Sequence, residues 1–318
     1  MLPEMERVVV EVFGGCDYSC TMCPQSVGRG AAFTRKMPFN LFENILDQLS
    51  GNPVINLEGS GEPTLAPDLP RYIQACTDRG FRSFIFTNGR KFTGQYMKDC
   101  IDAGLSFVRF SVIGYTPDLY TEWMTGDNFQ TIINNMKETR NYIESADSEC
   151  VMSSYHLILD NDNVDYEVEQ YKKNIVNETG SVAYIWKQHN WSGNIDASYV
   201  RQGEKRTCGR PFSNILTIRA GGNGGQRGAV TPCCQTMGEP NEEKSVLGHA
   251  SNMSLEDIWF GEKYNELRKG HEMKEWPDYC KNCDFLISDP EVLVWSNDPE
   301  ATNGKILGTN VLLHGDAS

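Results

Sequence analysis

Strand-like and helix-like segments alternate along residues 7–190, and this alternation restricts the fold more than any other feature of the chain. The expected strands cover residues 8–13, 54–57, 83–86, 107–113, 150–159 and 182–187. The expected helices lie near residues 40–50, 68–79, 92–103, 129–145 and 164–178. Such alternation predicts parallel strands joined by crossover helices, with functional groups at the carboxyl ends of the strands.

Three cysteines follow the first expected strand. Cys16, Cys20 and Cys23 have the spacing C-x3-C-x2-C and come directly after the break Gly14-Gly15. Three thiolates on one loop could hold three irons of a cubane iron–sulfur cluster and leave the fourth iron open. Part of a zinc site, which needs four nitrogen or sulfur ligands, and unrelated core thiols are the alternatives.

Polar and glycine-rich segments follow the next strands. The second strand leads into Glu58-Gly59-Ser60-Gly61-Glu62-Pro63, and the third leads into Thr87-Asn88-Gly89. Glycines let a ligand approach the backbone closely, although each segment could also be a simple turn. In the fourth strand, Arg109 and Ser111 share one face because side chains alternate along a strand.

The last third of the chain carries a second group of cysteines. We expect a hairpin of strands 215–219 and 229–231 around the glycine-rich residues 221–225, and then a helix over residues 254–269 with Ser254 as its cap. Four thiolates would come from Cys208, Cys233, Cys280 and Cys283, with Cys234 as a possible replacement for Cys233. Four cysteines suit either iron–sulfur or zinc. Three further cysteines are expected to be ordinary buried residues: Cys76, Cys100 and Cys150.

The first two thirds of the chain resemble the radical S-adenosylmethionine (SAM) enzymes, whose motif is C-x3-C-x-φ-C, with Met22 at φ. Residues 58–63 are similar to the family's GGEP motif, with Ser60 in place of the first glycine of the pair. The resemblance implies an α/β fold, a partial (β/α)6 TIM-type barrel, with a [4Fe–4S] cluster whose open iron binds SAM. It implies that the cluster is held by Cys16, Cys20 and Cys23, and that SAM is contacted by Met22, Gly59, Gly61, Glu62, Asn88, Ser111 and Gln188.

The last third resembles the SPASM or twitch extensions of these enzymes, through the pattern from Gly228 to Cys233 and the later cysteines. Cysteines for a further cluster are missing, so the resemblance implies the short twitch form, a β-hairpin plus helix around one auxiliary [4Fe–4S] cluster. Its implied ligands are Cys208, Cys233, Cys280 and Cys283. We expect the barrel at residues 1–200, the auxiliary domain at 201–290 and a C-terminal tail at 291–318.

The resemblance implies an enzyme that reductively cleaves SAM to a 5′-deoxyadenosyl radical and abstracts hydrogen from a substrate, with the auxiliary cluster taking part in electron transfer. A sugar, cyclitol or similar small molecule is expected, because the first strand begins too early for the leader-binding domain of many peptide maturases. Arg109 and Glu58 are the catalytic candidates, although Arg109 could equally be salt-bridged, and Glu58 is more simply read as a solvated loop carboxylate. Residues 186–193 could grip a ligand or form an aromatic hinge.

Two alternatives remain open. A peptide maturase would make a crosslink or epimerise a residue, with Cys100 or Cys150 as a hydrogen donor. A non-enzymatic protein, either zinc-stabilised or a two-cluster electron carrier, would explain the cysteines but not the SAM-like motifs on successive strands.

The composition of the chain restricts its possible partners and its location in the cell. A net charge of −14 argues against nucleic acid as a partner. The sequence has neither a signal peptide nor an apolar run of about 18 residues, so neither export nor a membrane is expected. Eleven cysteines without an export signal favour metal ligation in the cytoplasm over disulfides. The resemblance also implies a reducing partner such as flavodoxin or ferredoxin.

Overall fold

A single ten-stranded sheet organises the computed structural model, which describes residues 1–26, 35–195, 204–221, 226–236, 242–287 and 293–301 and the backbone of 305–306 and 309–310. The strand order is β10-β6-β5-β4-β3-β2-β1-β7-β8-β9. The strands are β1 Arg7–Val10, β2 Val54–Asn56, β3 Arg82–Thr87, β4 Leu105–Ser111, β5 Val151–Leu157, β6 Val182–Trp186, β7 Ile215–Ile218, β8 Ala229–Thr231, β9 Gly248–His249 and β10 Leu293–Ser296. A separate two-stranded sheet pairs β11 Lys305–Ile306 with β12 Thr309–Asn310.

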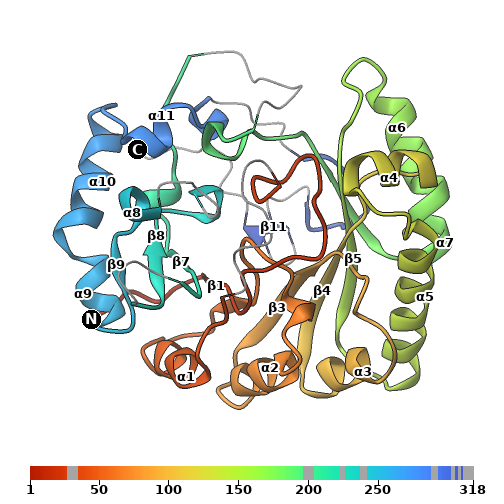
Figure 1. Ribbon diagram of the computed structural model, residues 1–318, viewed down its shortest axis with the longest axis horizontal. Coiled ribbons are helices and arrows are strands. Elements are labelled where there is room, and N and C mark those ends of the chain that lie inside the picture. The colour runs from red at the N-terminus through yellow and green to blue at the C-terminus, as the bar shows by residue number, and fades with distance from the viewer. Residues whose placement is uncertain are drawn as a thin grey trace.

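Strands β1 to β6 pair with one another in parallel, as the alternation in the sequence predicts. The connecting helices are α1 Phe39–Asp47, α2 Leu69–Thr77, α3 Gly94–Asp102, α4 Pro117–Met124, α5 Phe129–Ser145, α6 Val164–Tyr171 and, after a π turn at Lys172–Val176, α7 Asn177–Thr179. Figure 1 shows α1, α2 and α3 side by side along the outer face of the sheet, with α5 next to them. This arrangement confirms the α/β fold with a partial (β/α)6 barrel.

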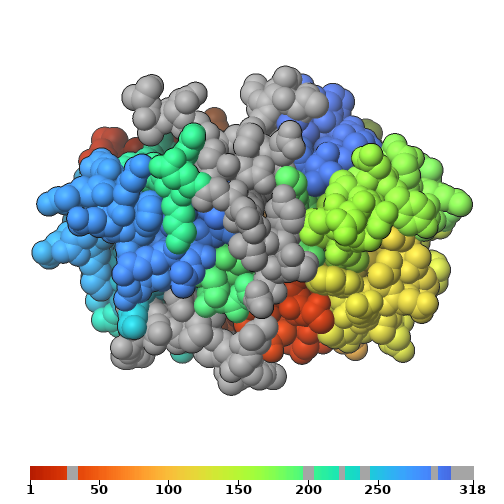
Figure 2. Space-filling model, turned by 90° about the horizontal axis from the view of Figure 1, so that it is seen from above, coloured from red at the N-terminus to blue at the C-terminus, as the bar shows by residue number. Residues whose placement is uncertain are grey.

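Helix α4 was not expected from the sequence. Two neighbouring residues mark the start of α4. Thr116 caps the helix by accepting a hydrogen bond from the Leu119 amide, and Pro117 occupies the first turn. The helix matters because it lies against the first cysteine loop. Seen from above, the red N-terminal segment lies beside the yellow segment that contains α4 (Figure 2).

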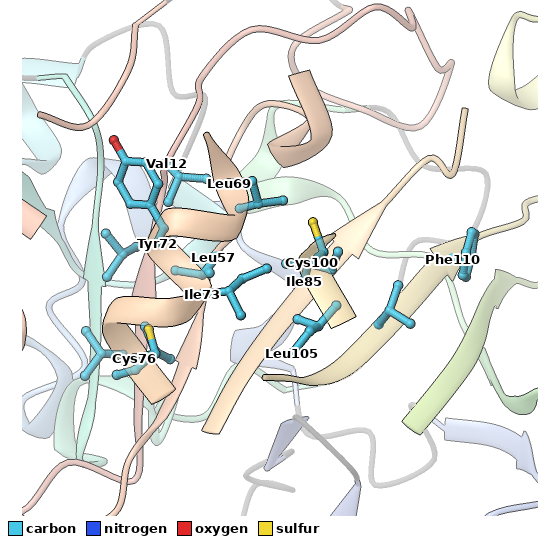
Figure 3. Close-up of a cluster of buried hydrophobic side chains, with 14 of the residues drawn as sticks. Val12, Leu57, Leu69, Tyr72, Ile73, Cys76, Ile85, Cys100, Leu105 and Phe110 are labelled. Atoms are coloured by element: carbon cyan, nitrogen blue, oxygen red, sulfur yellow. The ribbon is translucent and has the colours of Figure 1, made fainter. Parts of the chain in front are cut away.

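The main hydrophobic core fills the space between the strands and their helices. Figure 3 shows Leu57, directly after β2, and Ile85 of β3 in one core with Ile73 and Cys76 of α2 and Cys100 of α3. Cys150 belongs to the same core. The three isolated cysteines are therefore ordinary buried residues, as expected, and the core position of Cys100 and Cys150 does not suit a hydrogen donor to a bound substrate.

The C-terminal part continues the sheet through β7, which pairs parallel to β1 and antiparallel to β8. The expected hairpin is confirmed, although its turn at residues 222–225 lies outside the described residues. The remaining elements are the short 3-10 turns Pro63–Leu65, Trp191–Gly193, Arg210–Phe212, Cys234–Thr236 and Asp284–Leu286, and the helices α8 Glu242–Ser245, α9 Leu255–Trp259, α10 Glu262–Glu272 and α11 Asp278–Lys281.

The single helix expected over residues 254–269 is wrong, because α9 ends at Trp259 and α10 begins at Glu262. Gly261 between them has an extended backbone, and a Cβ there would lie 2.7 Å from the Asp257 carbonyl oxygen. The cap at Ser254 is confirmed by the hydrogen bond of 3.0 Å that its Oγ accepts from the Asp257 amide.

Strand β10 returns to the barrel and pairs antiparallel with β6, with Leu293 opposite Trp186. None of the helices in the described part of the chain has the length and apolarity needed to span a bilayer.

Candidate active site

The first cysteine loop lies at the carboxyl end of β1 and packs against α4. The Cys20 thiol contacts the Met124 sulfur at 3.7 Å, and the Tyr18 amide donates to Cys16 Sγ at 3.4 Å. Burial, together with the nearby Glu62, Asp17 and Cys23, raises the pKa of Cys16 to about 12, although the Tyr18 amide opposes this effect. Burial also raises the pKa of Cys20, again with Cys16 and Cys23 as neighbours.

The three thiols therefore converge and are half-buried, which fits three thiolate ligands of one cluster. Without a metal they stay protonated at neutral pH, so metal binding must release their protons. Within the described ranges, no group of three His, Cys, Asp or Glu side chains is placed so that it could hold a single metal ion. A cubane cluster takes one thiol per iron, so its ligands need not be arranged in that way.

Asp17, which sequence reasoning missed, ties this loop to the segment after β3. Asn88 Nδ2 donates to Asp17 Oδ1 at 2.8 Å, and Arg90 Nη1 donates to Asp17 Oδ2 at 3.0 Å. The structure therefore brings Asn88, a predicted SAM contact, to the cysteine loop, and its amide nitrogen holds that loop in place.

Glu62 joins the segments that follow β1, β2 and β3. Its carboxylate accepts hydrogen bonds from Thr64 N and Oγ1, from Thr87 Oγ1 at 2.7 Å and from Asn88 N at 2.7 Å. Burial raises the pKa of Glu62 despite these bonds. Its amide donates to the Gly15 carbonyl at 2.8 Å, next to Cys16.

The glycines of the same segment are required by close backbone approach. A Cβ on Gly61 would lie 2.2 Å from the Phe13 carbonyl oxygen, and a Cβ on Gly59 would lie 2.5 Å from the Glu11 side chain. Only glycine lets this segment reach the residues that lead into the cysteine loop.

Glu11 is a second residue that sequence reasoning missed. Its carboxylate is fully buried and accepts hydrogen bonds from Arg35 Nε at 3.0 Å, from Ser60 N at 2.9 Å and Oγ at 2.6 Å, and from Ala220 N at 3.2 Å. Burial favours its neutral form, but Arg35 and the Ser60 hydrogen bonds outweigh burial and hold the pKa of Glu11 below its usual value. The serine at which the motif departs from GGEP is therefore a partner of Glu11.

The barrel interior holds a group of charged and polar side chains between β1, β2 and β4. Asn56 Nδ2 donates to Glu58 Oε1 at 3.0 Å, and Glu58 Oε2 is buried without a hydrogen-bond partner among the described residues. Burial raises the pKa of Glu58, although Asn56, Arg7 and Arg109 oppose this effect. The simpler expectation for Glu58, a solvated loop carboxylate, is therefore wrong. Its carboxylate lies near the charges of Arg7 on β1 and Arg109 on β4.

Arg109 lies on β4 with 2% of its surface exposed. Its Nε donates to Ser153 Oγ at 3.1 Å, and its guanidinium lies 4.2 Å from the centre of the Tyr184 ring. Arg7, which sequence reasoning missed, is 7% exposed, and its Nε makes no hydrogen bond to the part of the chain that is described. The structure therefore brings Arg109 and Glu58 together and adds Arg7 to them.

Ser111 and Gln188 flank this interior. Ser111 ends β4 beside Tyr155 of β5 and is half-buried. Gln188 is buried and donates from Nε2 to the Ile158 carbonyl at 2.9 Å, so its amide links the ends of β5 and β6. The Met22 carbonyl accepts a hydrogen bond of 2.9 Å from Trp191 Nε1.

The second cysteine group lies beyond β7 and β8. Burial raises the pKa of Cys208 to about 11, of Cys233 to about 12 and of Cys283 to about 11, with Cys208 and Cys233 neighbours of one another and Cys283 a neighbour of both. Cys280 lies one turn before Cys283, and the Cys283 amide donates to the Cys280 carbonyl at 2.9 Å. Converging thiols that are buried or half-buried fit an iron–sulfur cluster here as well.

The adjacent cysteines 233 and 234 face different surroundings. Cys233 acts electrostatically on Tyr264 and Tyr279 of the C-terminal part. The Cys234 sulfur accepts a hydrogen bond of 3.1 Å from Arg210 Nη1. Its electrostatic effect reaches Arg7 and Tyr155 in the barrel.

Comparison with known protein families assigns both halves of this arrangement. The family model described as the radical SAM superfamily matches residues 10–172, which contain the first cysteine loop and the glycine segment. The chain belongs to the radical SAM superfamily. A second model, the SPASM iron–sulfur cluster-binding domain, matches residues 213–284 and includes Cys233, Cys280 and Cys283.

Two relatives of this radical SAM enzyme match nearly its full length. A tungsten-containing aldehyde ferredoxin oxidoreductase cofactor-modifying protein of Pyrococcus furiosus is 23% identical over 350 aligned positions, covering 94% of each chain. An S-adenosyl-L-methionine-dependent 2-deoxy-scyllo-inosamine dehydrogenase of Niallia circulans is 24% identical over 293 positions, covering 89% of this chain and 94% of the relative.

Two solved structures share the fold. BtrN in complex with AdoMet and 2-DOIA superposes with a TM-score of 0.60 at 19% identity, covering 93% of this chain and all of BtrN. SuiB of Streptococcus suis, bound to the precursor peptide SuiA, gives a TM-score of 0.64 at 14% identity, covering 89% of this chain and 70% of SuiB. The chain is thus a radical SAM enzyme whose cofactors are SAM, a [4Fe–4S] cluster and an auxiliary cluster in the SPASM-type domain.

Proposed function

We propose that this radical SAM enzyme oxidises a small polar molecule, a sugar, cyclitol or similar compound. The observation that carries the proposal is a group of polar side chains inside the barrel, formed by the buried Arg7, Asn56 and Arg109 and by Glu58, whose Oε2 is buried. Buried polar atoms without partners are costly, so Glu58 Oε2 and Arg7 Nε are suited to bind the polar groups of a substrate. The match to a relative named as a dehydrogenase of a cyclitol supports the same class of substrate.

We assign the cofactor ligands as follows. The SAM-binding cluster is held by Cys16, Cys20 and Cys23, and SAM by Met22, Gly59, Gly61, Glu62, Asn88, Ser111 and Gln188. The auxiliary cluster is held by Cys208, Cys233, Cys280 and Cys283. Cys233 is preferred to Cys234 because it is an electrostatic neighbour of Cys283, whereas the Cys234 sulfur accepts a hydrogen bond from Arg210. The proposed domains are residues 1–200, 201–290 and 291–318.

When bound, SAM and its cluster would supply a 5′-deoxyadenosyl radical that removes a hydrogen atom from the substrate. The auxiliary cluster would accept the second electron of the oxidation. Glu58 accepts the proton of the substrate hydroxyl, because burial raises its pKa towards the range of a general base. Arg109 and Arg7, both buried, orient the oxygen atoms of the substrate.

Replacing Glu58 by glutamine tests the proton step. We expect product formation to fall by about 100-fold, while SAM still binds, because the amide cannot accept the hydroxyl proton. In the unmodified enzyme, activity should rise with pH through the raised pKa of Glu58, and this dependence should disappear in the variant. Equal pH profiles in the two proteins would remove Glu58 from the mechanism, and Glu169→Gln, at an exposed position, serves as the control.

The substrate class is tested by incubating anaerobically reconstituted enzyme with SAM, a reductant and a panel of sugars, cyclitols and amino sugars labelled with deuterium on carbon. Transfer of deuterium into 5′-deoxyadenosine, with oxidation of the compound, supports the proposal. A peptide is the second candidate, because SuiB, which shares the fold, was solved with a precursor peptide bound. Deuterium transfer from labelled peptides and from none of the small molecules would favour that candidate. We propose a flavodoxin or ferredoxin as the physiological reductant.

A further inference from the structure

Residues 189–193, which we call the bridging segment, contact both cysteine loops. On one side, Trp191 Nε1 donates to the carbonyl of Met22, which lies between Cys20 and Cys23, at 2.9 Å. On the other side, Ser192 Oγ donates to the Tyr279 carbonyl at 2.7 Å, directly before Cys280.

Asn190 extends the contact with the second loop. Its Nδ2 donates to the Asn282 carbonyl at 2.7 Å. Its backbone amide donates to Asp284 Oδ2 at 3.1 Å, and the Asp284 amide donates back to Asn190 Oδ1 at 3.1 Å. The residues on both sides of Cys283 are therefore hydrogen-bonded to one asparagine.

Ring contacts run in parallel with these hydrogen bonds. The His189 ring lies 4.6 Å from the Trp191 ring and 5.7 Å from the Phe285 ring, measured between centres. A packed path thus leads from the Met22 carbonyl through Trp191 and His189 to the residues that follow Cys283.

The backbone of the bridging segment is strained. Trp191 has φ of 47° and Ser192 has φ of 60°, a left-handed region that side chains other than glycine seldom adopt. Two such residues in succession persist only where the surroundings hold them, and such strain gathers at functional sites. Here the hydrogen bonds to the two cysteine loops hold the segment in this conformation.

We propose that the bridging segment couples the two metal sites, so that SAM binds more tightly when the auxiliary site is filled. The proposal rests on the cysteine ligands assigned above. Metal binding orders the loop that carries its ligands. An ordered loop at residues 279–285 holds Asn190 and Ser192, these fix Trp191, and Trp191 fixes the carbonyl between Cys20 and Cys23. SAM then meets a loop that is already ordered and loses less conformational entropy on binding. Trp191 is a positioning residue in this account.

A double-mutant cycle tests the coupling. SAM affinity is measured by titrating SAM into reduced protein and following the EPR signal of the SAM-binding cluster. The cycle comprises the unmodified protein, Trp191→Phe, the double variant Cys280→Ala/Cys283→Ala, and all three substitutions together. We expect the tryptophan variant and the double cysteine variant each to weaken SAM binding by about fivefold or more. The combined protein should bind no more weakly than the weaker of the two, because both changes break the same connection.

Two results would overturn the proposal: SAM affinity unchanged in Trp191→Phe, or losses that multiply in the combined protein. Trp276→Phe is the matched control, since the Trp276 Nε1 is buried and has no hydrogen-bond partner among the described residues. It should bind SAM like the unmodified protein.

Further measurements separate this proposal from the ligand assignment. Iron that stays unchanged in the double cysteine variant would show that the auxiliary ligands are wrongly assigned, and the affinity of Trp191→Phe then decides the coupling alone. Should Trp191→Phe fail to take up its first cluster, Ser192→Ala decides instead. That variant removes the bonds of the Ser192 hydroxyl to the Tyr279 carbonyl and to the Cys283 thiol and leaves Trp191 in place, so weaker SAM binding supports the coupling and unchanged binding contradicts it.

Discussion

Replacing Cys20 by alanine should abolish SAM cleavage and remove one cluster, about half of the iron bound to the reconstituted protein. The Cys20 thiol is half-buried and packs against Met124. Burial raises its pKa most, and the neighbouring Cys23 and Cys16 raise it as well. Alanine offers no ligand, and two remaining thiols leave two irons of the cubane without protein ligands. Iron and sulfide analysis together with 5′-deoxyadenosine formation measures the effect.

Cys76→Ala is the matched control for this loss. Cys76 is equally a cysteine but lies in the core between α2 and the strands, with no exposed surface. The control should lose some stability and keep its full iron content and SAM cleavage. Full iron content in Cys20→Ala would contradict the assignment of the first cluster.

Replacing Glu11 by glutamine should lower the free energy of unfolding by about 3–5 kcal/mol, because it removes the charge of a fully buried carboxylate that pairs with Arg35. Glu11 is fully buried, and Arg35 Nε lies 3.0 Å from its Oε1, with side chains that are 0% and 10% exposed. The same carboxylate also holds Ser60 and the Ala220 amide, so the change loosens the glycine segment and the junction with β7. Urea unfolding of the reconstituted protein measures the loss.

The pH dependence of this stability has a definite sign. The pKa of Glu11 is lowered in the folded protein from its ordinary value of 4.5. Its stabilisation is therefore complete above that ordinary value and disappears as the pH falls through the lowered pKa. The glutamine variant should lack this acid-side loss. Glu144→Gln, which breaks the exposed pair with Arg140, should cost at most about 0.5 kcal/mol, and an equal cost at Glu11 would contradict the structural role given to it.

The sequence predicted the six parallel strands and most of their helices because those patterns are local: apolar runs, helical periodicity and glycine or proline at the ends. It missed the break between α9 and α10, because Gly261 interrupts a pattern that otherwise keeps one apolar side. It also missed α4, although Thr116 and Pro117 formed a readable start signal.

The site was harder to predict wherever partners come from distant segments. Glu11 reads as one polar residue within an apolar strand, and its buried role depends on Arg35, Ser60 and Ala220. Glu58 follows a strand, where solvent exposure is the simple expectation, and its charged neighbours Arg7 and Arg109 come from other strands. The sequence of residues 186–193 is compatible with a ligand grip or an aromatic hinge, and only the structure shows that Trp191 reaches Met22.

The most direct test of the account is the iron and sulfide content of anaerobically reconstituted protein, with EPR spectra of the reduced state before and after SAM is added. The account predicts about eight irons and eight sulfides per chain, and one of two cluster signals that shifts with SAM. About four irons that respond to SAM would remove the auxiliary cluster from residues 208–283. Zinc in place of iron, or spectra that ignore SAM, would contradict the assignment of Cys16, Cys20 and Cys23 to a SAM-binding cluster.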